Sequence, residues 1–451
     1  MMKRVIMNMF RNAHEIMSTT YPISLRERVG VRREKCRVIP CIFLSRSGFL
    51  LFLALAVIDS PLAVAQETGQ TPVLIHAARV FDGNDIKSNV SVLVVGGVIA
   101  QIDRREAFKS AHAKVIDLGD ATLLPGFIEL HAHLAFQQVA ADTVLKHGIT
   151  TVRDVGGPLH RPYGGDGSLR VLTSGPIITA PGGYPIAQLG AENIAIAVAT
   201  EQQAREAVGK LINGGAVVIK VALEPGGEAG APWVSEHHHV GAKHGNPHRK
   251  ASDAKKAWPL LPINIVRAIV DEAHKQGRKV TAHIGEASGT RIAIDAGVDE
   301  WAHIPCSVIP KALLKKAVAQ NVKTITTLDA LSKCPGIIDN ARALAALGGE
   351  FLYGAEIAHP DIPWGIDAQE LIAMMHVTGM QAIEVLRSAT SKSGRYLNSP
   401  LLGTLQPGAP ADMIAVKGDP AQSLKALEYP DLVMSGGKIV VNNFERSVNM
   451  P

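Results

Sequence analysis

The chain has 451 residues, of which 47% are hydrophobic and 19% charged, a balance typical of a globular protein with a large core. Only 4% are aromatic, which argues against a nucleic-acid surface built on stacked bases. The net charge of +5 does not indicate an acidic partner, because residues 1–65 hold ten of the 46 Lys and Arg but four of the 41 Asp and Glu. The remainder has 36 basic and 37 acidic residues, so we expect no nucleic-acid or anionic-membrane binding.

Residues 1–65 are predicted to form an export leader. Arg46 precedes the short apolar run 49–58, and Ala63-Val64-Ala65 follows as a small-x-small cleavage site. We expect cleavage after Ala65, no stable membrane span afterwards, and a periplasmic or secreted mature protein. An uncleaved anchor is the alternative, and Met17 or a later start is an alternative to Met1.

Two cysteines, Cys306 and Cys334, lie outside the leader. An oxidising compartment allows a disulfide between them, and two free buried thiols are the alternative. Neither has a Cys-x-x-Cys partner, so a cysteine zinc site is not indicated.

Short strands are predicted at both ends of the mature chain, separated by Gly and Asn or Asp turn signals. They cover residues 73–78, 90–95, 98–102 and 115–117, and later 411–416, 432–434 and 438–442. The first group is too short to bury a sheet face alone. We therefore predict that residues 66–122 and 399–451 together form one small β-sandwich.

Strand-like and helix-like stretches alternate in residues 123–398. The helix at 263–276 has one apolar face and ends at Gly277, and Asp367 with Glu370 has the pattern of a capping box. The expected strands are the run from Leu123 to His131 and residues 150–154, 177–180, 217–221, 280–283, 300–303, 323–327 and 351–356. This alternation predicts an α/β fold, a TIM-like (β/α)8 barrel, whose sites lie at the C-terminal strand ends.

Residues 224–258 interrupt the alternation and are rich in Gly, Pro, Lys and His, including His237-His238-His239, His244 and His248. A solvated loop over the mouth of the barrel is one interpretation. A tract that binds metal on its own is the other.

The predicted strand ends carry residues typical of a metal site. Residues i and i+2 of a strand point to the same side, so His131 and His133 can direct both imidazoles at one ion. Four later strands end in further candidates: Lys220, His283, His303 and Glu356. Each alone has an ordinary alternative, such as a lysine that reaches solvent or a hydrogen-bonded histidine. A barrel would bring all six to one mouth, which favours the metal site.

This sequence resembles the amidohydrolase superfamily, and within it the metal-dependent prolidases and imidazolonepropionase-like hydrolases. The resemblance covers nearly all of residues 72–443. Its motifs are Leu124-Pro125-Gly126-Phe127-Ile128 before His131-Ala132-His133, then residues 148–154, 271–274 before His283, 296–298 before His303, and 403–408 before 411–413.

The resemblance implies a barrel with a β-sandwich and two divalent metal ions, most often zinc. His131 and His133 would hold one ion, His283 and His303 the other, and Lys220, carboxylated on its amine, would bridge them. An ammonium repels a cation, whereas a carbamate supplies two anionic oxygens. His and carboxylate ligands also accept manganese, iron or cobalt. Members of the family commonly form homo-oligomers.

The eighth strand departs from the family pattern, which normally ends in Gly-Thr-Asp where this chain has Gly354-Ala355-Glu356. We expect Glu356 to replace the aspartate both as a metal ligand and as the group that shuttles a proton. Asp361 is a less suitable substitute.

The chemistry that such a site suits is hydrolysis, because two ions lower the pKa of a bridging water and polarise a carbonyl. Glu356 would pass the hydroxide proton to the leaving nitrogen. We expect a small-molecule or dipeptide substrate with an amide bond, such as a Xaa-Pro dipeptide or an N-acyl amino acid. The alternatives are a cyclic amide, a lactone or a carbamate at the same site, and a non-catalytic metal-binding protein silenced by Glu356.

Four further residues are given expected roles. Tyr184 follows the third expected strand and is a candidate substrate contact, although packing under a loop is the alternative. Arg153 and Asp154 are expected to form a structural ion pair below the mouth, and His274 is expected to be structural.

Overall fold

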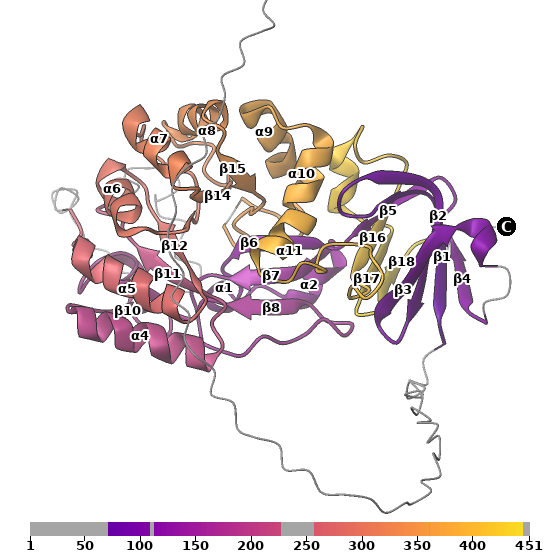
Figure 1. Cartoon of the computed structure of the whole chain (residues 1–451), viewed down its shortest axis with the longest axis horizontal. Coiled ribbons are helices and arrows are strands. Elements are labelled where there is room, and N and C mark those ends of the chain that lie inside the picture. Colours follow the sequence, from indigo (N-terminus) through magenta and orange to yellow (C-terminus); the bar gives the residue numbers. More distant parts are fainter. Residues whose placement is uncertain (1–70, 109–111, 227–256, 360, 445–451) are drawn as a thin grey trace, which may run out of the picture. The chain divides into compact units, whose positions relative to one another are not determined.

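The computed structural model describes residues 71–108, 112–226, 257–359 and 361–444 (Figure 1). The expected leader and the histidines of the tract 224–258 lie outside these ranges. In the described ranges, no helix has the length and apolar character that crossing a membrane requires.

Strands from both ends of the chain form one eight-stranded sheet. Its members are β1 (Val73–Phe81), β2 (Ile86–Val95), β3 (Val98–Arg104), β4 (Lys114–Asp117), β5 (Ala121–Pro125), β16 (Met413–Lys417), β17 (Leu432–Ser435) and β18 (Lys438–Asn442). The order is β18-β17-β16-β5-β1-β2-β3, and β4 pairs with β1. Strand β5 joins the groups, since it runs parallel to β1 and antiparallel to β16. The two ends therefore share one sheet, and Figure 1 shows the indigo and yellow strands side by side.

Alternation along these strands explains the burial of one face. Val90, Val92 and Val94 of β2 point to the same side and are buried, together with Ile75 and Met413 from β1 and β16. The apolar residues of both chain ends thus fill a common core.

A glycine divides the expected strand Leu123–His131 into two. β5 ends at Pro125 and β6 begins at Phe127, and the Gly126 N–H donates to the carbonyl of Asp412 at 3.0 Å. A Cβ at position 126 would lie 2.2 Å from the side chain of Thr150, so this close approach requires glycine. Strand β5 consequently belongs to the end sheet, and β6 to the middle of the chain.

Parallel strands occupy the middle of the chain in two sheets. The first contains β6 (Phe127–Ala132), β7 (Ile149–Asp154) and β8 (Arg170–Thr173). The second has seven strands in the order β10-β9-β11-β12-β13-β14-β15. Their bounds are β9 (Ile177–Thr179), β10 (Ala195–Ala197), β11 (Val218–Ala222), β12 (Lys279–His283), β13 (Glu300–Trp301), β14 (Lys323–Ile325) and β15 (Glu350–Leu352). The predicted α/β fold with parallel strands is confirmed, although β8 and β10 were not expected.

Two contacts join these two sheets. The Val217 N–H, just before β11, donates to the carbonyl of Thr173 in β8 at 2.9 Å. On the other side, Ala132 of β6 forms a parallel bridge with Ile357, which follows β15. This connectivity is compatible with the expected barrel.

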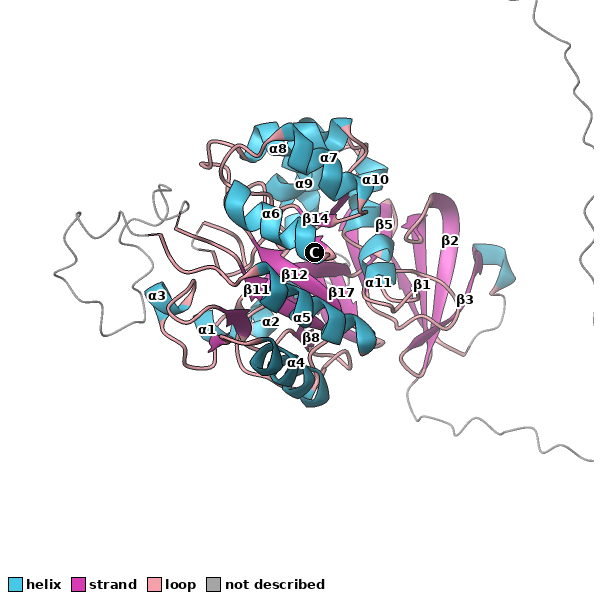
Figure 2. Ribbon diagram, turned by 60° about the vertical axis from the view of Figure 1, so that its left-hand side comes forward, coloured by secondary structure: helices cyan, strands magenta, loops and turns pink. Residues whose placement is uncertain are grey.

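The helices surround the parallel strands. They are α1 (Leu134–Gln137), α2 (Ala141–Lys146), α3 (Ile186–Leu189), α4 (Glu201–Gly214), α5 (Ile263–Lys275), α6 (Ala287–Ala296), α7 (Lys311–Ala319), α8 (Ile337–Ala346), α9 (Ala368–Thr378), α10 (Ala382–Ser388) and α11 (Ser391–Tyr396). Consecutive helices from α4 to α9 contact each other. Figure 2 shows β11, β12 and β14 between α4 and α5 on one side and α6 to α9 on the other.

The expected capping box before α9 is only half formed. The Asp367 side chain accepts the N–H of Gln369 at 2.9 Å, as an N-cap residue does. In a full capping box the Glu370 side chain would accept the backbone N–H of Asp367. Here its Oε2 accepts the N–H of Asp329 at 2.7 Å instead. The Asp367 N–H instead donates to the hydroxyl of Tyr353 at 3.0 Å. The glutamate therefore ties α9 to the segment after β14.

Cys306 and Cys334 form a disulfide, with their Cα atoms 4.9 Å apart. Of the two alternatives for these cysteines, the paired one is therefore observed. Both are buried, and the bond links the segment after β13 to the segment after β14.

Candidate metal centre

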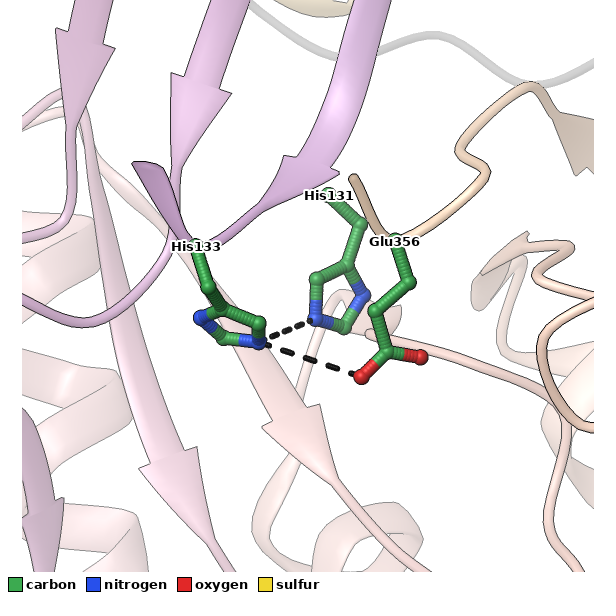
Figure 3. Close-up of side chains that lie close together, drawn as sticks. All are labelled: His131, His133 and Glu356. Atoms are coloured by element: carbon green, nitrogen blue, oxygen red, sulfur yellow. Dashed lines mark hydrogen bonds and ion pairs between the residues drawn. The ribbon is translucent and has the colours of Figure 1, made fainter. Parts of the chain in front are cut away.

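Three of the predicted ligands lie together where β6 and β15 end. Nε2 of His131 lies 3.3 Å from Nε2 of His133, which lies 3.9 Å from Oε1 of Glu356. One possible ligand atom from each residue lies within 4.8 Å of the others. Figure 3 shows the two imidazoles and the carboxylate directed at each other from three points of the backbone. Such a set of two nitrogens and one oxygen can hold a divalent ion.

The orientation of His131 follows from its place on a strand and from one hydrogen bond. His131 is 1% exposed, and its Nδ1 is hydrogen-bonded to the carbonyl of Ala302. Since a carbonyl only accepts, Nδ1 carries the proton, and Nε2 presents its lone pair towards His133 and Glu356. This is the arrangement in which protein imidazoles bind metals.

A tight turn directs the Glu356 carboxylate back towards β6. Glu356 has a left-handed backbone with φ of +64°, which is uncommon for a residue other than glycine. Two backbone hydrogen bonds hold the turn. The backbone N–H of His359 donates to the carbonyl of Glu356 at 2.9 Å, and the backbone N–H of His133 donates to the carbonyl of Ile357 at 3.0 Å.

The other two predicted histidines form a second pair beside the first. Nε2 of His303 lies 2.7 Å from Nδ1 of His283. The ring of His303 also stacks on that of His131, with centroids 5.9 Å apart and planes at 21°. The four imidazoles therefore form one continuous cluster.

Lys220 lies within electrostatic reach of this cluster and is 1% exposed. Burial, followed by the Lys220 charge, holds the pKa of His131, His133 and His283 well below the usual value for histidine. These imidazoles are therefore neutral near neutral pH, which is the form that binds metals.

An aromatic stack borders the cluster. The ring of Tyr184 lies 4.4 Å from that of His283 and 5.7 Å from that of Trp258, nearly parallel to both. The backbone N–H of Trp258 donates to the carbonyl of Pro225 at 2.8 Å. Trp258 was not among the predicted site residues, because only the fold brings it beside a strand end.

The expected ion pair between Arg153 and Asp154 is not formed. Neighbouring residues of β7 point to opposite sides, and Arg153 instead makes two hydrogen bonds to Glu300, at 2.5 and 3.0 Å. Asp154 accepts the N–H of Ala135 at 3.1 Å, at the start of the short helix after His133.

Asp361 and His274 both form ion pairs or hydrogen bonds away from the candidate metal centre. Asp361 is exposed and pairs with Lys333 at 3.4 Å, so its carboxylate is engaged elsewhere. His274 of α5 is hydrogen-bonded to Asp299 at 2.8 Å, in agreement with a structural role.

The chain is similar to proteins of the amidohydrolase family. The model of the amidohydrolase family matches residues 122–440. An uncharacterised protein of Mycobacterium tuberculosis is 25% identical over 349 residues, which cover 70% of this chain and 84% of that protein. The ochratoxinase of Aspergillus niger is 26% identical over 196 residues, which cover 39% of this chain and 40% of the enzyme.

Solved structures show the same fold. A Xaa-Pro dipeptidase with bound methionine in its active site has a TM-score of 0.64 at 23% identity, over 82% of this chain and 99% of that one. The Aspergillus niger ochratoxinase structure also has a TM-score of 0.64, at 19% identity over 82% and 96% of the two chains.

Proposed function

The chain belongs to the amidohydrolase family and is a hydrolase that acts on carbon–nitrogen bonds, and on this basis we propose that it cleaves the amide bond of a small substrate with the help of divalent metal ions. The likeness to a Xaa-Pro dipeptidase supports Xaa-Pro dipeptides as a substrate class, and N-acyl amino acids are the second class that we propose. The observation that carries the proposal is the convergence of His131, His133 and Glu356.

We further propose how the strands of the chain divide into two domains. We propose that the strands from β6 to β15 close into a (β/α)8 barrel within residues 123–398. The two contacts between the parallel sheets support this closure. The eight-stranded sheet would belong to the small β-sandwich domain that we propose for residues 66–122 and 399–451.

The residues present fit a pair of divalent ions, zinc above all. Nitrogen ligands with one carboxylate suit zinc, and burial, the largest cause of the lowered pKa of His131, His133 and His283, favours their neutral form. His131, His133 and Glu356 would hold one ion and His283 and His303 the other, with carboxylated Lys220 between them. Bound there, the ions supply a hydroxide near neutral pH and polarise the scissile carbonyl.

We propose that protein side chains carry out the proton transfer and contact the substrate. Glu356, with 18% of its side chain exposed, would take the proton of the attacking water and deliver it to the leaving nitrogen. Tyr184 and Trp258 would contact the apolar part of the substrate, since their stacked rings border His283.

We also propose that the mature protein begins near Gln66 and is exported to a periplasmic or extracellular compartment. The Cys306–Cys334 disulfide supports this location, because such bonds persist in oxidising compartments.

The experiment that tests the proposed function is a substrate panel. Purified protein loaded with Zn²⁺ is assayed against Xaa-Pro dipeptides, N-acyl amino acids, cyclic amides, lactones and carbamates. Hydrolysis of the first two classes that is abolished by a chelator supports the proposal. Hydrolysis of lactones or carbamates alone would support the alternative bond type, and no hydrolysis would contradict the proposal.

A further inference from the structure

A fully buried carboxyl group links strand β6 to the segment after β15 beside the candidate metal centre. Glu129 lies on β6 and is 0% exposed. Its Oε1 accepts the N–H of His131 at 2.6 Å, and its Oε2 accepts the N–H of Ala355 at 2.9 Å. Ala355 immediately precedes Glu356, so one side chain joins the backbone of one candidate ligand to the backbone beside another.

The local sequence makes this connection possible. Glu129 and His131 are two residues apart on a strand, so both side chains point to the same side. The residue opposite is Gly354, where a Cβ would lie 2.3 Å from Cγ2 of Ile325, 3.1 Å from Oε1 of Glu129 and 3.3 Å from Cβ of His131. Glycine at this position therefore fits the close packing of Ile325, Glu129 and His131 around it.

Burial of a carboxyl group costs free energy unless hydrogen bonds compensate for it. Here each oxygen has one backbone donor, and both donors belong to segments that carry candidate ligands. Because the bonds end at His131 and Ala355, a change in the Glu129 side chain would shift His131 relative to Glu356.

We infer that Glu129 is a positioning residue that sets the separation of His131 from Glu356 and thereby the affinity of the site for its divalent ion. The inference rests on the proposed function, since it requires that these residues bind metal. Residues that orient metal ligands typically change metal affinity by about 10- to 100-fold when they are replaced.

The test is Zn²⁺ binding by the full chain, measured by competition with a chromophoric chelator on apoprotein. In Glu129→Gln, one of the two N–H groups faces an amide NH₂ instead of an acceptor. We therefore expect Zn²⁺ affinity to fall by about tenfold or more. In the Co²⁺-loaded variant, the absorption spectrum should also shift, because it reports ligand geometry.

Glu370→Gln is the matched control. Glu370 is likewise 0% exposed and accepts a backbone N–H, that of Asp329, but it has no hydrogen bond to a candidate ligand. We expect its Zn²⁺ affinity to stay within about threefold of the parent and its Co²⁺ spectrum to be unchanged. An equal loss in both variants would mean general destabilisation and would overturn the inference.

The remaining outcomes separate the inference from the proposed function. A parent chain that binds Zn²⁺ and a Glu129→Gln variant that binds it equally well would overturn the inference alone. A parent that binds no Zn²⁺ would overturn the proposed function and the inference with it. Should Glu129→Gln fail to fold, Glu129→Asp, one methylene shorter, decides: weaker binding supports positioning, and unchanged binding refutes it.

Discussion

Glu356 lies where the resemblance to the family implies an aspartate, and its geometry supports its proposed role in hydrolysis. The carboxylate is longer by one methylene than the usual aspartate, yet a left-handed turn brings it within 3.9 Å of His133. We predict that Glu356→Ala lowers kcat by about 10²- to 10⁴-fold, the usual contribution of an acid–base group. Steady-state kinetics on metal-loaded protein measure this change.

Two variants complete the experiment on Glu356. Asp361→Asn, which alters an exposed ion pair with Lys333, should leave kcat within about twofold of the parent. Glu356→Asp should be less active than the parent, because its carboxylate would lie farther from His133. An inactive parent that becomes active in Glu356→Asp would instead indicate a silenced site.

A second prediction concerns Lys220. If its carboxylated amine bridges two ions, Lys220→Ala should lose most of the bound metal, and added acetate or propionate should restore part of it. Elemental analysis of the purified protein measures both effects. Lys279→Ala is a suitable control, because Lys279 begins the neighbouring strand β12 and donates to the carbonyl of Tyr396 at 2.8 Å. Unchanged metal content in Lys220→Ala would exclude the bridge.

Some contacts around the candidate site could be predicted from the sequence and others could not. The His-x-His spacing and the strand ends predicted which side chains would meet, because parallel strands end at one edge. The Glu129 connection could not be predicted, because its partner Ala355 is 226 residues away and donates a backbone N–H that no motif records. Arg153 was paired wrongly, because adjacency along a strand does not mean contact.

Among the elements, the long periodic ones were predictable and the short ones were not. The apolar face expected for 263–276 is buried in α5, at Val266, Ile269 and Ala273 among others. Strand β10 spans only Ala195–Ala197, which is too short for alternation to be visible. Strand β5 was assigned to the wrong sheet because an apolar run does not show where it bends.

The bend between β5 and β6 yields a prediction about stability. Gly126→Ala would place a Cβ 2.2 Å from Thr150, and we expect the free energy of unfolding to fall by about 1–3 kcal/mol, as for other overpacked sites. Urea denaturation measures it. In Gly209→Ala on α4, the new Cβ would meet its nearest neighbour at 3.9 Å, so the change should be neutral or slightly stabilising. Equal effects in the two variants would contradict the steric explanation.

Over the whole molecule, buried carboxyl groups make stability depend on pH. Burial raises the pKa of Glu370 from the ordinary 4.5 to about 8, so the folded chain keeps a proton that the unfolded chain releases. Between these values, each added pH unit removes up to about 1.4 kcal/mol of stability. The advantage of the folded state is therefore complete below pH 4.5 and is lost as the pH rises towards 8.

We accordingly predict that apoprotein of Glu370→Gln, which cannot ionise there, loses less stability than the parent between pH 5 and pH 8. Thermal or urea unfolding across this range measures the difference. Glu206→Gln on α4, an exposed site, should follow the parent. A parent and a Glu370→Gln variant with the same pH dependence would show that Glu370 is ionised in the folded chain.

The export proposal also concerns the whole chain. N-terminal sequencing of protein recovered outside the cytoplasm should begin near Gln66. Mature protein that retains residues before Ala65 would contradict cleavage at the predicted site.

The sheet shared by the two chain ends has a consequence for biosynthesis. Thr122 donates a hydrogen bond to the carbonyl of Gly418, 296 residues later, and β5 has β16 as its neighbour. Residues 413–417 must therefore be synthesised before β5 can pair with β16. Contacts so distant in sequence slow folding.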